Sequence, residues 1–268
     1  MFRTSLKKIW PIVPILGAFL FTSILLIIFD TSPLEGASAV WAGAFGTIEK
    51  VYSVTAFWIP LTFAAIGLLV TFTAGLWNIG IEGQIILGSL AASWVALTFD
   101  FSHGVMIFLE ISAAMIAGAL WAAISAVLKT KGKVHEIFSG LALTNLAIIL
   151  TNFLISGPWQ PAEGGTFRGT APFREAALFV RYENSRLSIF SLVLLFIAIA
   201  IVSVLLSNTH WGLRLKALGR NARSSFLLGV SSDNETVYAM MLCGAFAGLG
   251  GAIRVLSWFD SLRQSISG

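Results

Sequence analysis

The stretch LWNIGIEGQ, residues 76–84, interrupts an otherwise apolar chain with two amides, one carboxylate and two glycines. Polar side chains and irregular backbone are costly in hydrocarbon and persist there only where protein or a water-filled cavity satisfies them. We therefore predict a broken helix near 76–84 in which Asn78, Glu82 and Gln84 face a solute path. The alternative is a cytosolic loop between two spans, with Glu82 near the start of the second helix, where a carboxylate suits the helix dipole.

The composition of the rest of the chain is that of a membrane protein. Of the 268 residues, 57% are hydrophobic and 11% are charged, whereas a soluble domain is about 25% charged. The apolar runs are continuous and long enough for helices of about 20 residues, unlike the alternating segments of about ten residues in a transmembrane β-barrel. The sequence therefore predicts an all-α, polytopic transmembrane helix bundle that forms a single domain over 1–268. The seven predicted membrane segments are 9–29, 54–76, 79–99, 105–128, 134–156, 189–206 and 237–256.

The basic residues lie mainly between the apolar runs, where they indicate topology rather than nucleic-acid binding. The first span follows basic residues and is predicted to be uncleaved, with the N-terminus in the cytoplasm. The basic loop 129–133 and the loop 207–236 are predicted to be cytoplasmic as well. The loop 157–187 falls outside by parity, although it contains several arginines.

The cytoplasmic loop 207–236 predicts a short amphipathic helix. Asn221 can cap a helix that runs through Leu228, and Phe226 and Leu227 would give that helix an apolar patch beside its basic residues. Such a helix suits docking into a partner's groove, and it equally suits lying on anionic lipid. The residue pattern leaves both possibilities open.

A capping-box pattern, Ser232-x-x-Glu235, precedes the last predicted span, and we predict that these two side chains cap the N-terminus of its helix. Gly244 and Gly248 lie four residues apart within that span, and Gly118 lies in a similar stripe of small residues in the fourth span. Small residues at this spacing let two helices approach closely. We therefore predict helix packing at these three glycines.

Other polar residues also lie inside predicted spans. Ser139 and Asn145 are in the middle of the fifth span, where each needs a partner, so they are candidates for the path or for helix contacts. Glu110 lies near the outer end of its span, and we expect it to snorkel or pair rather than to face a cavity. The three histidines have no metal-ligand spacing, so we predict no metal site and no cofactor. Cys243, the one cysteine, is predicted to be a small buried hydrophobe.

Three stretches of the chain resemble the permease subunits of bacterial ABC importers for nucleosides and simple sugars, a group related to branched-chain amino-acid and ribose importer permeases. LWNIGIEGQ at 76–84 is similar to the NIG-x-EGQ signature of that group, and VHEIFSGLALTNLA at 134–147 is similar to its N-E-x-x-S/T segment. The third stretch begins Leu218-Gly219-Arg220-Asn221 and continues to the glycine-rich 243–252. It resembles the cytoplasmic coupling element and the membrane helix that follows it.

The resemblance implies one half of a translocation path in the bacterial inner membrane, for a nucleoside or a simple sugar. The implied partners are ABC ATPase subunits, a second permease subunit that is identical or different, an extracytoplasmic substrate-binding protein and membrane lipid, with no nucleic acid. The sequence lacks the phosphate-binding pattern G-x-x-x-x-G-K-S/T, so we expect ATP hydrolysis in a separate subunit and no enzyme activity in this chain. The implied path residues are Asn78, Glu82, Gln84, Ser139 and Asn145. The implied coupling residues are Arg214, Leu218, Gly219, Asn221, Arg223, Phe226, Leu227 and Gly229.

The chain departs from the pattern of that group in two ways. His135 and Gly140 stand where the group usually has Asn and a hydroxyl residue. Permeases of the group also continue for several more helices, so we expect the C-terminal part of the family domain to be missing from this chain. The alternative function is an ion-coupled secondary transporter of a small polar solute, in which Glu82 or Glu110 carries a proton.

Overall fold

The structure is a computed structural model that describes residues 12–161, 169–182, 185–227, 229–264 and 266. Its contacts divide the chain into two compact units, Met1–Val54 and Thr55–Gly268, whereas the sequence predicts one domain. The described residues are mostly helical and form no β-strand, apart from a single backbone bridge between Gly169 and Arg263. The predicted all-α class is confirmed.

The first unit contains α2 (Ile12–Ile28) and α3 (Pro33–Phe45). Asp30 adopts a left-handed backbone conformation between them, with φ 55°. Pro33 begins α3, because the first turn of a helix needs no amide hydrogen from that position. The two helices are bent by 108° at this break. The predicted first span, 9–29, corresponds to α2, and its first three positions lie outside the described residues.

Six of the described helices are long and apolar enough to cross a membrane, and the bent pair α2 and α3 would be a seventh if it counts as one span. This confirms the predicted polytopic bundle. The six helices are α4 (Ile48–Thr73), α5 (Ile81–Thr98), α6 (His103–Thr130), α7 (Glu136–Ser156), α8 (Ile189–Asn208) and α11 (Ser232–Ile253). The shorter elements are η1 (Glu175–Ala177), α9 (His210–Arg220), α10 (Ala222–Leu227) and the π-helical turn η2 (Arg254–Phe259).

The start of α11 differs from the sequence prediction. The helix begins at Ser232 rather than at 237, its N-cap residue is Ser231, and no side chain caps it. The predicted capping box is therefore wrong. The carboxylate of Glu235 instead forms an ion pair with Arg214 of α9, 3.1 Å away, which removes it from the backbone amides that a capping box would satisfy.

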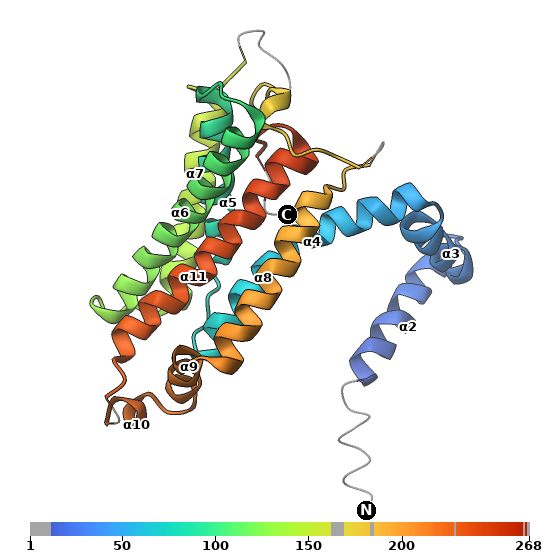
Figure 1. Cartoon of the computed structure of the whole chain (residues 1–268). Helices are drawn as coiled ribbons and strands as arrows, with labels where there is room; N and C mark the ends of the chain where they lie inside the picture. Colours follow the sequence, from blue (N-terminus) through green and yellow to red (C-terminus); the bar gives the residue numbers. More distant parts are fainter. Residues whose placement is uncertain (1–11, 162–168, 183–184, 228, 265, 267–268) are drawn as a thin grey trace, which may run out of the picture. The chain divides into compact units, whose positions relative to one another are not determined.

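The helix α11 is the centre of the second unit, with α5 and α6 packed along it (Figure 1). In the span Ser232–Phe259, which contains α11, 83% of the 18-residue apolar stretch is buried, against 28–56% for the corresponding stretches of the other five candidate spans. A Cβ atom built on Gly118 of α6 would lie 2.1 Å from the carbonyl oxygen of Gly244. A Cβ atom on Gly88 of α5 would lie 2.2 Å from the Cα atom of Gly248. These helices touch backbone to backbone, where only glycine fits.

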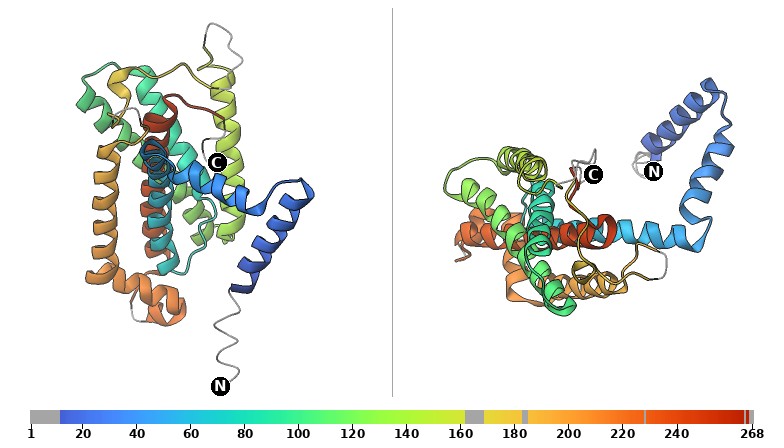
Figure 2. Two further views of the ribbon diagram at one scale, coloured as in Figure 1. Left: turned by 90° about the vertical axis from the view of Figure 1, so that its right-hand side faces the viewer. Right: turned by 90° about the horizontal axis from the view of Figure 1, so that it is seen from above.

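The spanning helices alternate in direction, so the second unit has two ends. One end carries α9, α10, the turn 74–80 and the loop 131–135, and we call it the α9 end; it lies at the bottom of Figure 1 and of the left view in Figure 2. At the opposite end, which we call the η1 end, the segment after α7 lies over the end of α11. There the amide of Phe173 donates to the carbonyl of Asp260 at 2.8 Å, and that of Phe179 donates to the carbonyl of Leu256 at 3.2 Å.

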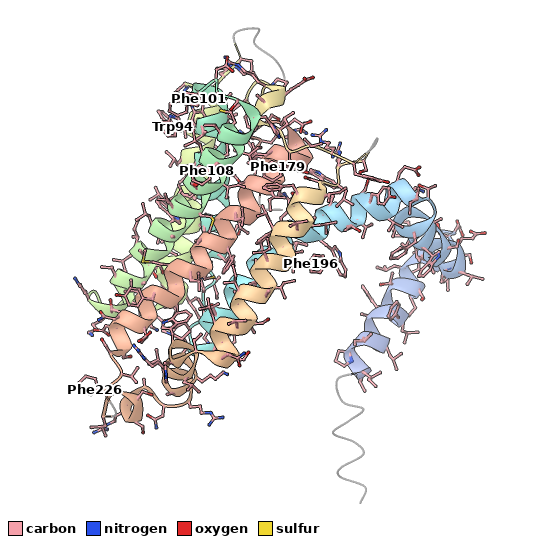
Figure 3. All side chains as sticks on the ribbon, viewed as in Figure 1. Trp94, Phe101, Phe108, Phe179, Phe196 and Phe226 are labelled. Carbon is pink, nitrogen blue, oxygen red and sulfur yellow. The ribbon has the colours of Figure 1, made fainter. Side chains whose placement is uncertain are left out.

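Large apolar side chains cover the outward faces of the second unit. Phe108 on α6 is 69% exposed and Phe196 on α8 is 66% exposed, and both point away from the bundle (Figure 3). Such a surface is unfavourable in water but suits a bilayer. The packing therefore agrees with a multi-pass membrane protein.

Candidate functional site

The turn 74–80 is held in place by three buried side chains, Asn78, Gln84 and Cys243, which we call the amide cluster. The Nδ2 of Asn78 donates to the Oε1 of Gln84 at 3.1 Å, and the Nε2 of Gln84 donates back to the Oδ1 of Asn78 at 3.0 Å. The Asn78 amide also donates to the Sγ of Cys243 on α11 at 3.0 Å. The cluster thus satisfies its own buried polar groups and ties the turn to the central helix.

This geometry agrees with the loop alternative for the stretch 76–84 better than with a break in the middle of a span. The backbone reverses at the α9 end, and α5 starts at Ile81 with Glu82 in its first turn, where the helix dipole favours a carboxylate. Asn78 and Gln84 face each other rather than open space. Cys243 is buried as predicted, but it also accepts a hydrogen bond, which a small hydrophobe would not do.

Replacing Asn78 with leucine should destabilise the protein by about 1–3 kcal/mol, because the buried amide of Gln84 loses both of its partner atoms. The double variant Asn78→Leu/Gln84→Leu should be less destabilised than the sum of the two single variants, since no buried amide is left unpaired. Thermal unfolding of the detergent-purified protein measures this coupling. Asn145→Leu is the control, since Asn145 is an exposed amide whose side chain donates to the carbonyl of Leu141 on its own helix. Additive losses at 78 and 84 would contradict the cluster.

A second group of contacts joins the turn to α6 and α7. The backbone amide of Trp77 donates to the Oε1 of Glu136 at 3.4 Å. The Oε2 of the same carboxylate accepts from the Nζ of Lys129 at 2.5 Å. Lys129 ends one span and Glu136 begins the next, so this pair closes the loop between α6 and α7. This ion pair was not predicted from the sequence, although a lysine and a glutamate at the two ends of a short loop indicate such a pair.

The other predicted path residues are not gathered in one cavity. Ser139 is buried, and its hydroxyl is 2.8 Å from that of Ser125 on α6. Glu82 and Asn145 are exposed on α5 and α7. Their sequence neighbours connect the two helices, because the backbone amide of Gly83 donates to the Oγ1 of Thr144 at 3.3 Å. Glu82 and Asn145 therefore lie on adjoining helices at one contact.

The helix α9 packs closely against the ends of two spanning helices. A Cβ atom on Gly219 would lie 2.3 Å from the carbonyl oxygen of Thr73 at the end of α4, and Gly75, with φ +74°, lies against the same glycine. A Cβ atom on Gly212 would lie 2.4 Å from the carbonyl oxygen of Leu205 on α8. Together with the ion pair between α9 and α11, these contacts leave α9 little freedom to move independently of α4, α8 and α11.

The predicted short helix corresponds to α10, and its predicted cap is confirmed. The Oδ1 of Asn221 accepts from the backbone amide of Ser224 at 3.0 Å. Phe226 is 69% exposed and Leu227 is 80% exposed. The predicted end of this helix, Leu228, lies outside the described residues. The helix therefore presents two large apolar side chains at the α9 end, and Gly229 follows in a left-handed conformation with φ +81°.

Of the remaining predicted coupling residues, Leu218 is buried on α9, whereas Arg214 and Arg223 are exposed. Arg214 nevertheless forms the ion pair with Glu235 described above.

The position of Glu110 differs from the prediction. Its side chain is completely buried, and neither carboxylate oxygen has a hydrogen-bond partner among the described residues. The residues one and two turns further along α6, Ala114 and Gly118, touch α11, so Glu110 lies on the face that packs inward and cannot snorkel. No group of three or more His, Cys, Asp or Glu side chains among the described residues could hold a metal ion.

Comparison with known proteins gives consistent results. A family model described as "branched-chain amino acid transport system / permease component" matches residues 51–261. The chain is 30% identical over 252 residues to the guanosine ABC transporter permease protein NupP of Bacillus subtilis. This match covers 93% of this chain and 72% of that protein.

Two further relatives are similar over comparable lengths. The glucose ABC transporter permease protein TsgB13 of Haloferax volcanii is 29% identical over 255 residues, covering 91% of this chain and 67% of that protein. The nucleoside ABC transporter permease protein NupB of Lactococcus lactis is 27% identical over 271 residues, covering 97% and 74%. No solved structure matches the chain significantly.

Proposed function

Because this chain belongs to the family of permease components of branched-chain amino acid transport systems, we propose that it forms one half of the translocation path of an ABC importer for a nucleoside. It is a permease subunit of an ABC transporter, and its similarity to such permeases over most of its length favours this function over the ion-coupled alternative. The choice of a nucleoside rests on one observation, the 30% identity to a guanosine permease over 93% of the chain. A simple sugar is the second candidate, supported by the similarity to a glucose permease.

In this proposal the α9 end faces the cytoplasm and the N-terminus is cytoplasmic. The lysines of the loop after α6 and the basic residues of α9 and α10 support this orientation, since cytoplasmic loops carry an excess of Lys and Arg. An extracytoplasmic binding protein would then deliver the solute at the η1 end. A second permease subunit, identical or different, would complete the path, with lipid around both.

The ATPase subunit would dock on α10. Phe226 and Leu227 supply exposed apolar anchors, with the cation of Arg223 on the same helix, and apolar anchors with a polar rim are typical of protein interfaces. Movement of α10 would be transmitted by α9, because Gly219 touches the end of α4 and Arg214 is paired with the start of α11. The close contacts of α9 support a rigid coupling role for residues 214–229.

The solute path would run along the face that α5 and α7 share. Glu82 and Asn145 are the two predicted path residues that are exposed there, beside the contact between Gly83 and Thr144. A second permease subunit covering this face would enclose them. Ser139 of α7 would support the path through its hydrogen bond to Ser125 of α6. Asn78 and Gln84 would hold the turn that positions Glu82.

Reconstitution tests the proposed function directly. The chain is purified with the ATPase, second permease subunit and binding protein that copurify with it, and uptake of labelled guanosine into proteoliposomes is measured. Uptake should require ATP and should be unaffected by a protonophore. Unlabelled inosine should compete and glucose should not. Uptake driven by a proton gradient without ATP would contradict the importer, and competition by glucose alone would reverse the order of the two substrates.

A further inference from the structure

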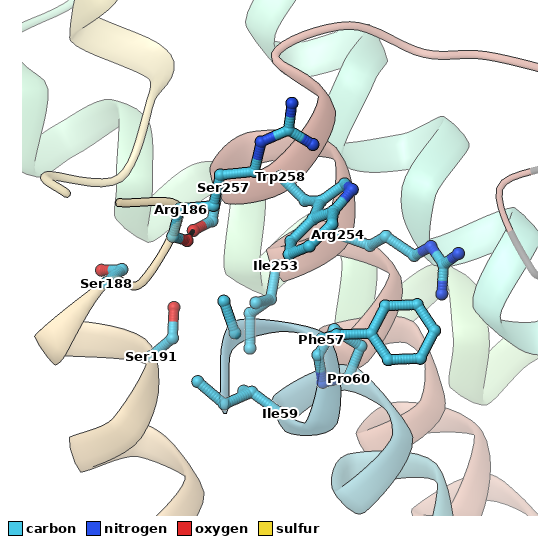
Figure 4. Close-up of a pocket in the computed structure, with 11 residues that line it drawn as sticks. Phe57, Ile59, Pro60, Arg186, Ser188, Ser191, Ile253, Arg254, Ser257 and Trp258 are labelled. Carbon is cyan, nitrogen blue, oxygen red and sulfur yellow. Dashed lines mark hydrogen bonds between the residues drawn. The ribbon is translucent and has the colours of Figure 1, made fainter. Parts of the chain in front are cut away.

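A small cavity at the η1 end of the second unit is lined by α4, the start of α8, the end of α11 and the π-helical turn η2 (Figure 4). Two irregular features meet there. Pro60 interrupts α4 and, having no amide hydrogen, leaves the carbonyl of Ala56 without its usual intrahelical donor. The turn η2 is π-helical, a distortion that occurs frequently at functional sites. Irregular backbone inside a membrane bundle is tolerated where protein buries it or where it lines a water-filled cavity.

Buried polar groups without partners line this cavity. Ser188 and Ser191 are each 1% exposed, and neither hydroxyl oxygen has a hydrogen-bond partner among the described residues. The same is true of the Nε of Arg254, whose residue is 8% exposed. An unpaired buried polar atom is uncommon because it loses its hydrogen bond to water. Three of them around one cavity are groups that a bound ligand or a water molecule could satisfy.

Aromatic rings and guanidinium groups form the opposite wall. The guanidinium of Arg254 lies 5.4 Å from the centre of the Phe57 ring, and that of Arg186 lies 4.8 Å from the ring of Trp258. Figure 4 shows Trp258 between the Arg186 guanidinium and the Phe57 ring, with Ser188 and Ser191 on the other side of the cavity. Cation–π contacts of this kind hold the two arginines in place.

We propose that this cavity, lined by Ser188, Ser191, Arg254 and Trp258, is a contact site for an uncharged solute that carries hydroxyl groups and a planar nitrogen ring. The inference rests on the proposed function and names a second contact for its substrate class, at the η1 end and apart from the path residues on α5 and α7. Hydroxyl side chains can both donate to and accept from solute hydroxyls, a guanidinium donates to ring nitrogens or carbonyl oxygens, and an indole ring offers a stacking face.

The cavity is closed in this structure. Its volume is about 10 Å³, which is room for one water molecule and not for a nucleoside. Admission of the solute therefore requires that α8 or η2 move away from α4. Since α8 and α11 both contact α9 at the opposite end of the bundle, a movement of α9 can reach both walls of the site.

The test compares guanosine uptake by the reconstituted complex with wild-type chain, with Ser188→Ala/Ser191→Ala and with Ser203→Ala. Ser203 is an exposed serine on the same helix α8, away from the cavity, and its variant is the matched control. With the binding protein saturated by guanosine, the double variant should show about a tenfold lower maximal uptake. Its melting temperature should equal that of the wild type, and the Ser203→Ala control should match the wild type in both uptake and melting temperature.

Two results would overturn the inference alone. If the wild-type complex takes up guanosine and the double variant does so at the same rate, the solute does not contact the serines. A lower melting temperature with unchanged uptake by the folded protein would show that the cavity holds a structural water molecule only. If wild-type complex takes up neither guanosine nor glucose, the proposed function itself fails, and this inference fails with it.

Discussion

Replacing Gly248 with valine is expected to leave almost no folded protein in the membrane. A Cβ atom at this position would lie 2.2 Å from the carbonyl oxygen of Ala114 on α6, and the Cα atom of Gly248 already touches Gly88 on α5. Both neighbours are backbone, which cannot move aside as a flexible side chain can. A side chain here must push α11 away from the backbone of α6, so the cost should reach or exceed the upper end of about 1–3 kcal/mol for ordinary overpacking.

The measurement is the yield of monodisperse protein after detergent extraction, followed by size-exclusion chromatography. Gly248→Ala should retain a reduced fraction with a lower melting temperature, and Gly248→Val should retain almost none. Gly104→Val is the matched control, because a Cβ atom at Gly104 on α6 meets nothing within 4 Å. Wild-type yield and melting temperature in Gly248→Val would show that the tight contact with α6 does not exist.

Changing Leu227 to glutamate is expected to abolish ATP-driven uptake while leaving membrane insertion intact. Leu227 is 80% exposed, so the substitution removes no packing inside the chain. If the side chain is an anchor for the ATPase subunit, its loss should cost at least about 2 kcal/mol of binding free energy, or roughly a 30-fold weaker association. Arg223→Glu should weaken association through the reversed charge, to a smaller extent because an exposed charge contributes less.

Titration of the purified ATPase against the permease in detergent measures this association, and uptake by proteoliposomes measures its consequence. Lys131→Glu is the control, because it reverses an exposed charge on a different loop at the same end. Normal uptake by both Leu227→Glu and Arg223→Glu would argue that α10 does not dock the ATPase. It would favour the other sequence interpretation, in which this helix lies on anionic lipid.

The fold was largely predictable from the sequence, because continuous apolar runs of membrane-spanning length have few alternative structures. The capped helix after Asn221 was also predictable, because a capping residue and the helix that it begins are neighbours in the sequence. The inward position of Glu110 was not predictable, because distance from the end of a span says nothing about the side of the helix. That side is set by Ala114 and Gly118, which contact α11, a helix more than a hundred residues further along the chain.

The candidate site was less accessible to sequence reasoning than the fold. Asn78 and Gln84 were correctly recognised as unusual, but their mutual hydrogen bonds and the contact with Cys243 join parts of the chain that no local pattern connects. The cavity at the η1 end was missed altogether. It forms where α4, α8 and the end of α11 meet, and no local sequence pattern connects Pro60 with Ser188 and Ser191.

The burial of Cys243 has a practical consequence for studying motion in this protein. The sequence contains a single thiol, and it is inaccessible and engaged by Asn78. A cysteine introduced at an exposed position of α10 or α8 would therefore be the one site in this chain open to maleimide or nitroxide reagents, without first replacing the native residue. Spectroscopic distances between such labels could follow the stroke of the transporter in an otherwise wild-type chain.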